Sequence, residues 1–220
     1  MFKLTPTGAE IVLHSFEGGT SDGSGPFGGV VRDTAGNLYG TTEFGGDMDE
    51  GIVFEVGKGK KLTVLHSFGQ STGDGAGPTA GLLRDSAGNL YGTTPNGGAH
   101  GSGAIFKVDP TGSETLFFSF PGDGSGGDAP AGGLVEDASG NLYGTTQLGG
   151  SFGCQLTDSC GAVFQVSPAG VETVLHSFSG PPSDGEEPLD GLISDSAGNL
   201  YGTTRLGGKN SCGIVFSVGE

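Results

Sequence analysis

The sequence has little positive charge and no long apolar segment. Only 9 of the 220 residues are Lys or Arg, against 25 Asp or Glu, and the formal net charge is −16. Binding to nucleic acid requires a basic surface, so we expect no nucleic-acid partner. No apolar run approaches the roughly 20 residues that cross a bilayer, and the opening residues lack the apolar core of a signal peptide. We therefore expect no membrane span, export signal or anchoring tail within this chain.

The sequence also lacks the patterns of α-helices. No segment has the length and the period of an amphipathic helix. The apolar residues lie instead in short runs that are rich in β-branched and aromatic residues and are bounded by Gly, Pro, Asp or Asn. Glycine makes up 48 residues, which would indicate disorder in a chain without a period. Because the glycines recur at fixed places, they indicate turns in a folded all-β repeat.

One seven-residue sequence, Gly-Asn-Leu-Tyr-Gly-Thr-Thr, occurs four times. An Asp precedes each copy by three residues, and a Gly-Gly pair follows each copy by three. Phe residues recur at matching distances, so the period is about 52 residues, with six extra residues in the loop 151–160. We predict a single repeat domain over residues 1–220. The four copies are Gly36–Thr42, Gly88–Thr94, Gly140–Thr146 and Gly198–Thr204.

Each unit contains four strand-like runs, which we name A to D. In the second unit they are Gly81–Asp85 (A), Leu90–Thr94 (B), Ile105–Val108 (C) and Thr115–Phe120 (D). Four-stranded antiparallel units at this spacing predict a β-propeller with four four-stranded blades per chain. Strand A is expected to line the central channel. The D–A and B–C loops are expected to share one face.

The last unit lacks a D strand of its own. We expect Glu10–Phe16 to pair with the C-terminal strand and close the last blade, because closure removes exposed strand edges. This leaves Phe2–Leu4 as a surplus C strand that competes with Val215–Val218. Two alternatives stay open, namely an eight-bladed ring shared by a homodimer and an open part of a longer propeller.

Several motifs resemble those of a known family. Leu-His-Ser-Phe, Gly-Asn-Leu-Tyr-Gly-Thr-Thr, the Gly-Gly pair and Gly-x-Val-Phe recur along the whole chain. Together they resemble the GloVer tandem-repeat family of bacterial proteins and, more distantly, the blades of NHL-type propellers. The resemblance implies an extracellular or cell-surface protein that is often tethered by a separate anchoring tail. It implies no biochemical activity.

The loops of one face supply the first candidate ligand-binding residues. Asp-Gly pairs make the D–A loops acidic, and a B–C loop adds a histidine. Carboxylates that converge from loops could bind a cation. The alternative is that Asp-Gly is turn chemistry and the charges are solvated. The candidates are Asp22, Asp74, Asp123, Asp184 and His100.

A second candidate set lies on strand A, at a position that differs among the units while its neighbours do not. The position is occupied by Arg32, Arg84, Glu136 and Ser194. These side chains could face the channel and tune a binding site. They could equally form a ring of ion pairs near the end of the channel.

A calcium site is the third candidate. Asp47, Asp49 and Glu50 lie in one B–C loop and resemble the start of a calcium-binding loop. The following glycine comes one residue too early, and no distal Glu completes the pattern. Apart from calcium we expect no cofactor.

Three histidines share one repeat position, but a structural role is favoured for them. They are His14, His66 and His176, and Phe118 fills the same position in the third unit. A position that accepts Phe favours packing between blades over metal binding or catalysis. The tyrosines of strand B and the aspartates before each heptad are expected to be structural as well. We assign no catalytic residue.

The chain has three cysteines. Cys160 and Cys212 hold the same repeat position, and Cys154 lies in the loop with the six extra residues. We predict a disulfide between Cys154 and Cys160, which would fit an oxidising compartment. Cys212 is then left unpaired.

Two functions fit these observations. The first is a non-catalytic extracellular module that binds a glycan or a surface protein through its acidic loop face, or serves as a structural repeat. The second is an enzyme that acts on polysaccharide, since some propellers are lyases or hydrolases. The second function requires paired carboxylates or a comparable set on one face. The unit-specific polar residues lie in different blades, so the first function is favoured.

Overall fold

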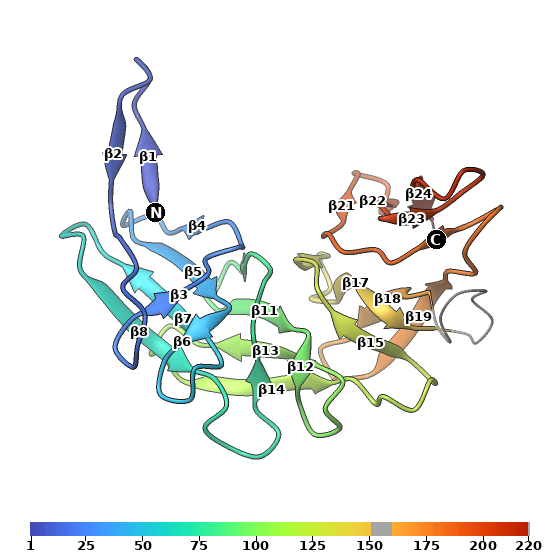
Figure 1. The fold of residues 1–220 in the computed structure, drawn as a ribbon, viewed down its shortest axis with the longest axis horizontal. Coiled ribbons are helices and arrows are strands. Elements are labelled where there is room, and N and C mark those ends of the chain that lie inside the picture. Colours follow the sequence, from blue (N-terminus) through green and yellow to red (C-terminus); the bar gives the residue numbers. More distant parts are fainter. Residues whose placement is uncertain (151–159, 220) are drawn as a thin grey trace.

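The chain is built from β-strands. The computed structural model describes residues 1–150 and 160–219, and every regular element in these ranges is a strand (Figure 1). The prediction of an all-β chain is therefore confirmed. Within the described residues there is no helix that could span a membrane.

The first two sheets each contain four antiparallel strands in the predicted order A–B–C–D. Strand A is short in both, while strands B, C and D are longer. The first sheet comprises β4 (Val31–Arg32), β5 (Leu38–Thr42), β7 (Ile52–Val56) and β8 (Leu62–Ser67). The second comprises β10 (Leu83–Arg84), β11 (Leu90–Thr94), β13 (Ala104–Val108) and β14 (Glu114–Ser119).

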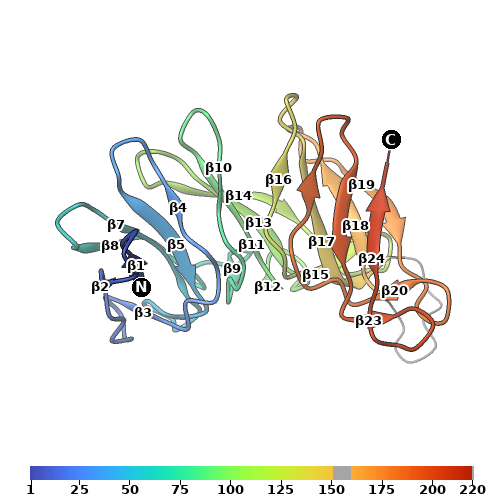
Figure 2. The same cartoon turned by 90° about the horizontal axis from the view of Figure 1, so that it is seen from above.

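The third sheet repeats this order, and the last sheet lacks strand D. All sheets follow one another in chain order along an arc (Figures 1 and 2). The third comprises β16 (Val135–Glu136), β17 (Leu142–Gly149), β18 (Ala162–Val166) and β19 (Glu172–Ser177), and β15 (Gly127–Pro130) also pairs with β17. The last comprises β21 (Ile193–Ser194), β22 (Leu200–Thr203) and β24 (Val215–Val218).

The seven-residue sequence recurs because its residues make the same local contacts in each unit. In the third unit the Asp137 carboxylate accepts hydrogen bonds from the backbone and side-chain nitrogens of Asn141, at 2.9 and 2.7 Å, and from the Tyr143 hydroxyl at 3.0 Å. Gly140 has a φ of +82°, in the left-handed region that a turn of this kind needs. These contacts fix the A–B turn, which confirms the structural role predicted for the Asp and the Tyr.

The second half of the heptad joins each sheet to the next. A Cβ at Gly144 would lie 2.7 Å from the Phe164 ring, so this glycine lets strand C pack closely on strand B. The Thr145 hydroxyl donates to the Asp190 carbonyl of the following sheet at 2.8 Å. Thr41 and Thr93 make the same bond to the sheets that follow them.

The core lies between neighbouring sheets. The Phe at the end of each strand D packs edge-on against the Phe of strand C in the next sheet, with ring centroids 5.0–5.3 Å apart. Phe68, Phe120 and Phe178 are at most 1% exposed. Burial of aromatic surface at each junction therefore stabilises the arrangement of the sheets. The ring pairs are Phe16–Phe54, Phe68–Phe106, Phe120–Phe164 and Phe178–Phe216.

The predicted closure by the N-terminal strand is wrong in this structure. Strand β2 (Glu10–Val12) pairs with β1 (Phe2–Leu4), whereas β24, among the described residues, pairs only with β22. A local cause favours this hairpin, because the turn between the two runs brings the Gly8 amide to the Thr5 carbonyl at 2.9 Å. Phe16 then packs on Phe54, so the hairpin occupies the place of a C–D pair that precedes the first sheet. It stands at one end of the arc (Figure 1).

Candidate functional site

The D–A and B–C loops meet at one end of the sheets, as predicted, and short two-stranded sheets tie them together (Figure 2). The loop that enters the second sheet also bonds to the first, because the Gly77 amide donates to the Glu50 carbonyl at 2.8 Å. Backbone hydrogen bonds thus run from loop to loop. The small sheets pair β3 (Gly23–Ser24) with β6 (Phe44–Gly45), β9 (Gly75–Ala76) with β12 (Asn96–Gly97), and β20 (Gly185–Glu186) with β23 (Leu206–Gly207).

The B–C loops share one backbone course although their side chains differ. Asp49, Gly101 and Ser211 hold equivalent positions, and all three have a positive φ, at 59°, 79° and 52°. The amides of Gly51, Gly103 and Gly213 donate to equivalent carbonyls at 3.0–3.1 Å. These three loops, which are described in full, therefore form a common frame that carries a different set of side chains in the first, second and last units.

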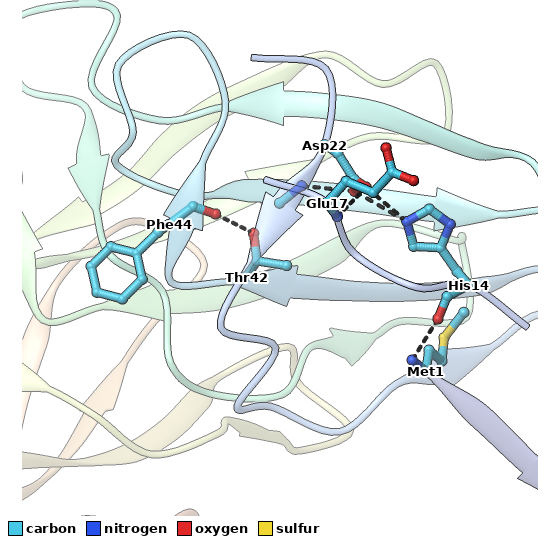
Figure 3. A network of polar contacts seen from close by, with 7 residues as sticks. Met1, His14, Glu17, Asp22, Thr42 and Phe44 are labelled. Atoms are coloured by element: carbon cyan, nitrogen blue, oxygen red, sulfur yellow. Dashed lines mark hydrogen bonds and ion pairs between the residues drawn. The ribbon is translucent and has the colours of Figure 1, made fainter. Parts of the chain in front are cut away.

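The predicted Asp residues of the D–A loops are engaged within their own loops. The Asp22 carboxylate accepts hydrogen bonds from the amides of Glu17 and Gly23, at 2.9 and 2.8 Å, and lies 3.1 Å from the His14 ring (Figure 3). The same arrangement joins Asp184 to His176 at 3.1 Å. These carboxylates organise the loops. His14 and His176 take part through their contacts with Asp22 and Asp184, where the sequence predicts packing between blades.

The third unit replaces this arrangement rather than losing it. Phe118 stands in place of the histidine and Gly126 in place of the Asp. The Glu172 carboxylate of the next D strand enters the vacated space and accepts the Gly127 amide at 2.9 Å. A Cβ at Gly126 would lie 2.2 Å from that carboxylate. In every unit a carboxylate thus accepts a hydrogen bond from the amide of this loop glycine. The carboxylate belongs to the preceding Asp in three units and to Glu172 in the third.

Asp123 is not the structural equivalent of the other three loop aspartates. It is exposed and accepts hydrogen bonds from the amide and hydroxyl of Ser125. These bonds lower its pKa, and the nearby His100 lowers it further. The structure therefore brings His100 and Asp123 near each other on the loop face.

A histidine and two carboxylates converge between the first and second sheets. The ligand atoms of His66, Asp74 and Glu114 all lie within 4.8 Å of one another. His66 is 3.3 Å from Asp74, whose side chain is 3% exposed. Burial raises the pKa of Glu114. The nearby His66 lowers this pKa, and the negative charge of Asp74 raises it further. Glu114 is not among the candidates predicted from the sequence, because its neighbours His66 and Asp74 belong to the preceding unit.

The three residues of the predicted calcium site do not come together. Asp49 accepts the Gly45 amide of its own loop at 2.8 Å, and Asp47 accepts from the Gln70 side chain at 2.8 Å. Glu50 is exposed. Within the described residues, the one group of three possible ligands is His66, Asp74 and Glu114.

The variable residues of strand A lie at the opposite end, beside the A–B turns (Figure 2). Arg84 lines a cleft of about 210 Å³ between the first and second sheets, together with Asp33 and Glu55. Burial raises the pKa of Glu136, and the negative charges of Asp85 and Asp137 add to the shift. Arg32 is exposed and lines a separate groove. The two predicted site sets therefore lie on different faces.

The cysteine prediction falls partly outside the described residues. Cys160 is fully buried, and Cys154 lies in the undescribed range. The pairing of Cys154 with Cys160 stays a prediction. Cys212 is a free and exposed thiol.

Solved structures share the fold. A streptogramin B lyase matches 90% of this chain with a TM-score of 0.55 and 16% identity. A putative gluconolactonase matches 97% with a TM-score of 0.54 and 17% identity, and a luciferin-regenerating enzyme matches 87% with a TM-score of 0.52 and 17% identity. The present chain spans 55%, 64% and 60% of their respective lengths. At this identity the likeness shows a propeller-like fold alone.

Sequence comparison gives the family. A search of curated proteins finds no match. The family model of the Gloeobacter/Verrucomicrobia repeat matches residues 1–217, in agreement with the resemblance of the heptad and the other recurring motifs. The chain therefore belongs to the Gloeobacter/Verrucomicrobia repeat family.

Proposed function

We propose that this chain is a non-catalytic binding module of an exported or cell-surface protein. The module binds a glycan or a surface protein on the face formed by the D–A and B–C loops. The observation that carries the proposal is the common loop frame, in which Asp49, Gly101 and Ser211 share a left-handed backbone and differ in side chain. A fixed frame with variable side chains lets the units present distinct contacts without loss of the fold.

The proposal extends to the domain organisation and to the closure of the propeller ring. We infer that residues 1–220 act as one repeat domain and that each sheet is one blade. The unpaired edges of β24 and β1 support completion of a larger ring by a second copy, as in the eight-bladed homodimer.

Loop exchange tests the binding face. Residues 43–51 are replaced by the sequence of residues 95–103, which has the same length and backbone course. The variant is expected to keep the unfolding temperature within a few degrees and to lose or change binding on a glycan array and to cell-surface proteins. An equal exchange at 205–213 serves as the matched variant. Saturable binding that neither exchange alters would overturn the loop face as the binding site.

The same glycans test the alternative, an enzyme acting on polysaccharide. The matched solved structures include a streptogramin B lyase and a putative gluconolactonase, and His66 with two carboxylates is a group that could take part in chemistry. Release of shortened or unsaturated sugars by the purified chain, and its loss in Glu114→Gln, would replace the binding proposal by the enzyme. Stable binding without product supports the module.

A further inference from the structure

Two sheets place three metal-binding groups around one point. His66 is near the end of β8, Asp74 lies in the loop that follows, and Glu114 begins β14 of the next sheet. Their ligand atoms lie within 4.8 Å of one another. We propose that His66, Asp74 and Glu114 bind one divalent transition metal of the zinc class, which bridges the first and second sheets.

The donor set selects the class of metal. One imidazole nitrogen and two carboxylate oxygens match the ligands of Zn²⁺, whereas Ca²⁺ and Mg²⁺ prefer oxygen alone. Three protein ligands leave a fourth position for water. His66 and Glu114 are partly buried and the Asp74 side chain is almost fully buried, so solvent reaches the site past His66 and Glu114.

A second observation concerns Glu114 itself. No hydrogen bond to its carboxylate is present among the described residues, although it is half-buried beside the negative charge of Asp74. A half-buried carboxylate that has no protein hydrogen-bond partner and lies beside another negative charge is held in an unfavourable environment. A cation shared by Glu114 and Asp74 supplies the missing partner and removes the repulsion between them.

The other units are natural controls. The pair His14–Asp22 meets Leu62 at the position of Glu114, and Glu172 meets Phe118 and Gly126 instead of a histidine and an Asp. Each of these sites lacks at least one ligand. The His–Asp bond is therefore part of the frame, and Glu114 is the added ligand that completes a metal site.

Metal titration tests the proposal. The full chain carries Cys212→Ser, which removes an exposed thiol ligand, and is stripped with chelator before titration with Co²⁺ or Zn²⁺. We expect one equivalent of metal and visible Co²⁺ absorption bands typical of nitrogen and oxygen ligands. Glu114→Gln and His66→Phe should each weaken binding at least tenfold. His66→Phe keeps the packing, because Phe118 fills that position in the third unit.

Matched variants make the outcome decisive. Glu172→Gln changes a half-buried carboxylate of the same repeat position and should leave the affinity within twofold. Leu62→Glu should add a second equivalent at His14–Asp22, and failure to do so in a folded variant contradicts the role given to Glu114. Absence of saturable Co²⁺ and Zn²⁺ binding, or equal binding by Glu114→Gln, overturns the site. A site of this kind can exist without any glycan binding, so its failure leaves the loop-face proposal untouched.

Discussion

At the scale of single residues, the first and third units differ by a set of three residues that act on the same loop amide. The third unit has Phe118, Gly126 and Glu172 where the first has His14, Asp22 and Leu62. In both sets a carboxylate accepts the amide of the loop glycine, at 2.9 Å from Glu172 and 2.8 Å from Asp22. We expect the three positions of the third unit to depend on one another, because there the carboxylate comes from Glu172 and the position of the loop Asp is a glycine.

Rebuilding the third unit tests this dependence. Gly126→Asp alone places a second carboxylate against Glu172, because a Cβ there would lie 2.2 Å from it. We expect a loss of about 1–3 kcal/mol in the free energy of unfolding, measured with urea. Adding Glu172→Leu and Phe118→His should restore most of the loss. Equal stability of the single and the triple variant would contradict the coupling.

A second prediction at this scale concerns pH. The folded chain raises the pKa of Glu114 above its ordinary value of 4.5, mainly by burial. A carboxyl with a raised pKa contributes stability that is fully present below the unfolded pKa and is lost as the pH rises through the folded pKa. In chelator, wild type should therefore lose stability relative to Glu114→Gln as the pH rises above about 4.5.

The measurement is the unfolding free energy of both proteins from pH 4 to 7. Glu10→Gln is the control, since Glu10 holds the same repeat position and is exposed in the N-terminal hairpin. A gap between wild type and Glu114→Gln that stays constant with pH would contradict the assigned shift.

Local side-chain roles could be predicted from the sequence, and contacts between units could not. Asp137 and Tyr143 are six residues apart, and the turn they share follows from residue type and spacing. Glu114 meets Asp74 across two sheets, and although Glu10 and Glu172 share its repeat position, the sequence does not show which His and Asp lie beside it. The strand order A–B–C–D is predictable because it is repeated. The pairing of Glu10–Val12 is not, because Phe2–Leu4 and Val215–Val218 compete for it.

At the scale of elements, the contact between consecutive sheets dominates. Phe120 is fully buried and packs on Phe164, with ring centroids 5.1 Å apart. We expect Phe120→Ala to lower the free energy of unfolding by about 3–5 kcal/mol, because it leaves a cavity between two sheets.

The matched control is Phe27→Ala, since Phe27 is 69% exposed. It should change stability by less than about 0.5 kcal/mol. Denaturant unfolding of both variants checks the prediction, and a similar effect of the two would show that the ring pairs are not the main core.

At the scale of the whole molecule, each end of the described array has a strand with one unpaired edge. Val215 on β24 is 81% exposed, and Phe2 on β1 is 58% exposed. Exposed apolar strand edges favour pairing with another chain. We expect light scattering to give the mass of two chains.

Val215→Lys should shift that mass toward one chain, because a charged side chain at an edge opposes pairing. Thr203 provides a second readout. It is exposed, whereas its equivalents Thr41, Thr93 and Thr145 bond to the following sheet. Protection of this region from hydrogen exchange should rise with protein concentration, and a single-chain mass at every concentration would exclude the shared ring.

In three units the hydroxyl of the first Thr in the seven-residue sequence donates to a carbonyl of the following sheet. The accepting carbonyls belong to Ala80, Gly132 and Asp190. The stabilising contacts therefore join neighbouring sheets, and the packing of one sheet does not depend on the total number of sheets. Duplication of one unit in the gene would add a sheet to the middle of the array and leave both ends as they were. The repeat array can therefore lengthen by whole units without disrupting the contacts between the existing sheets.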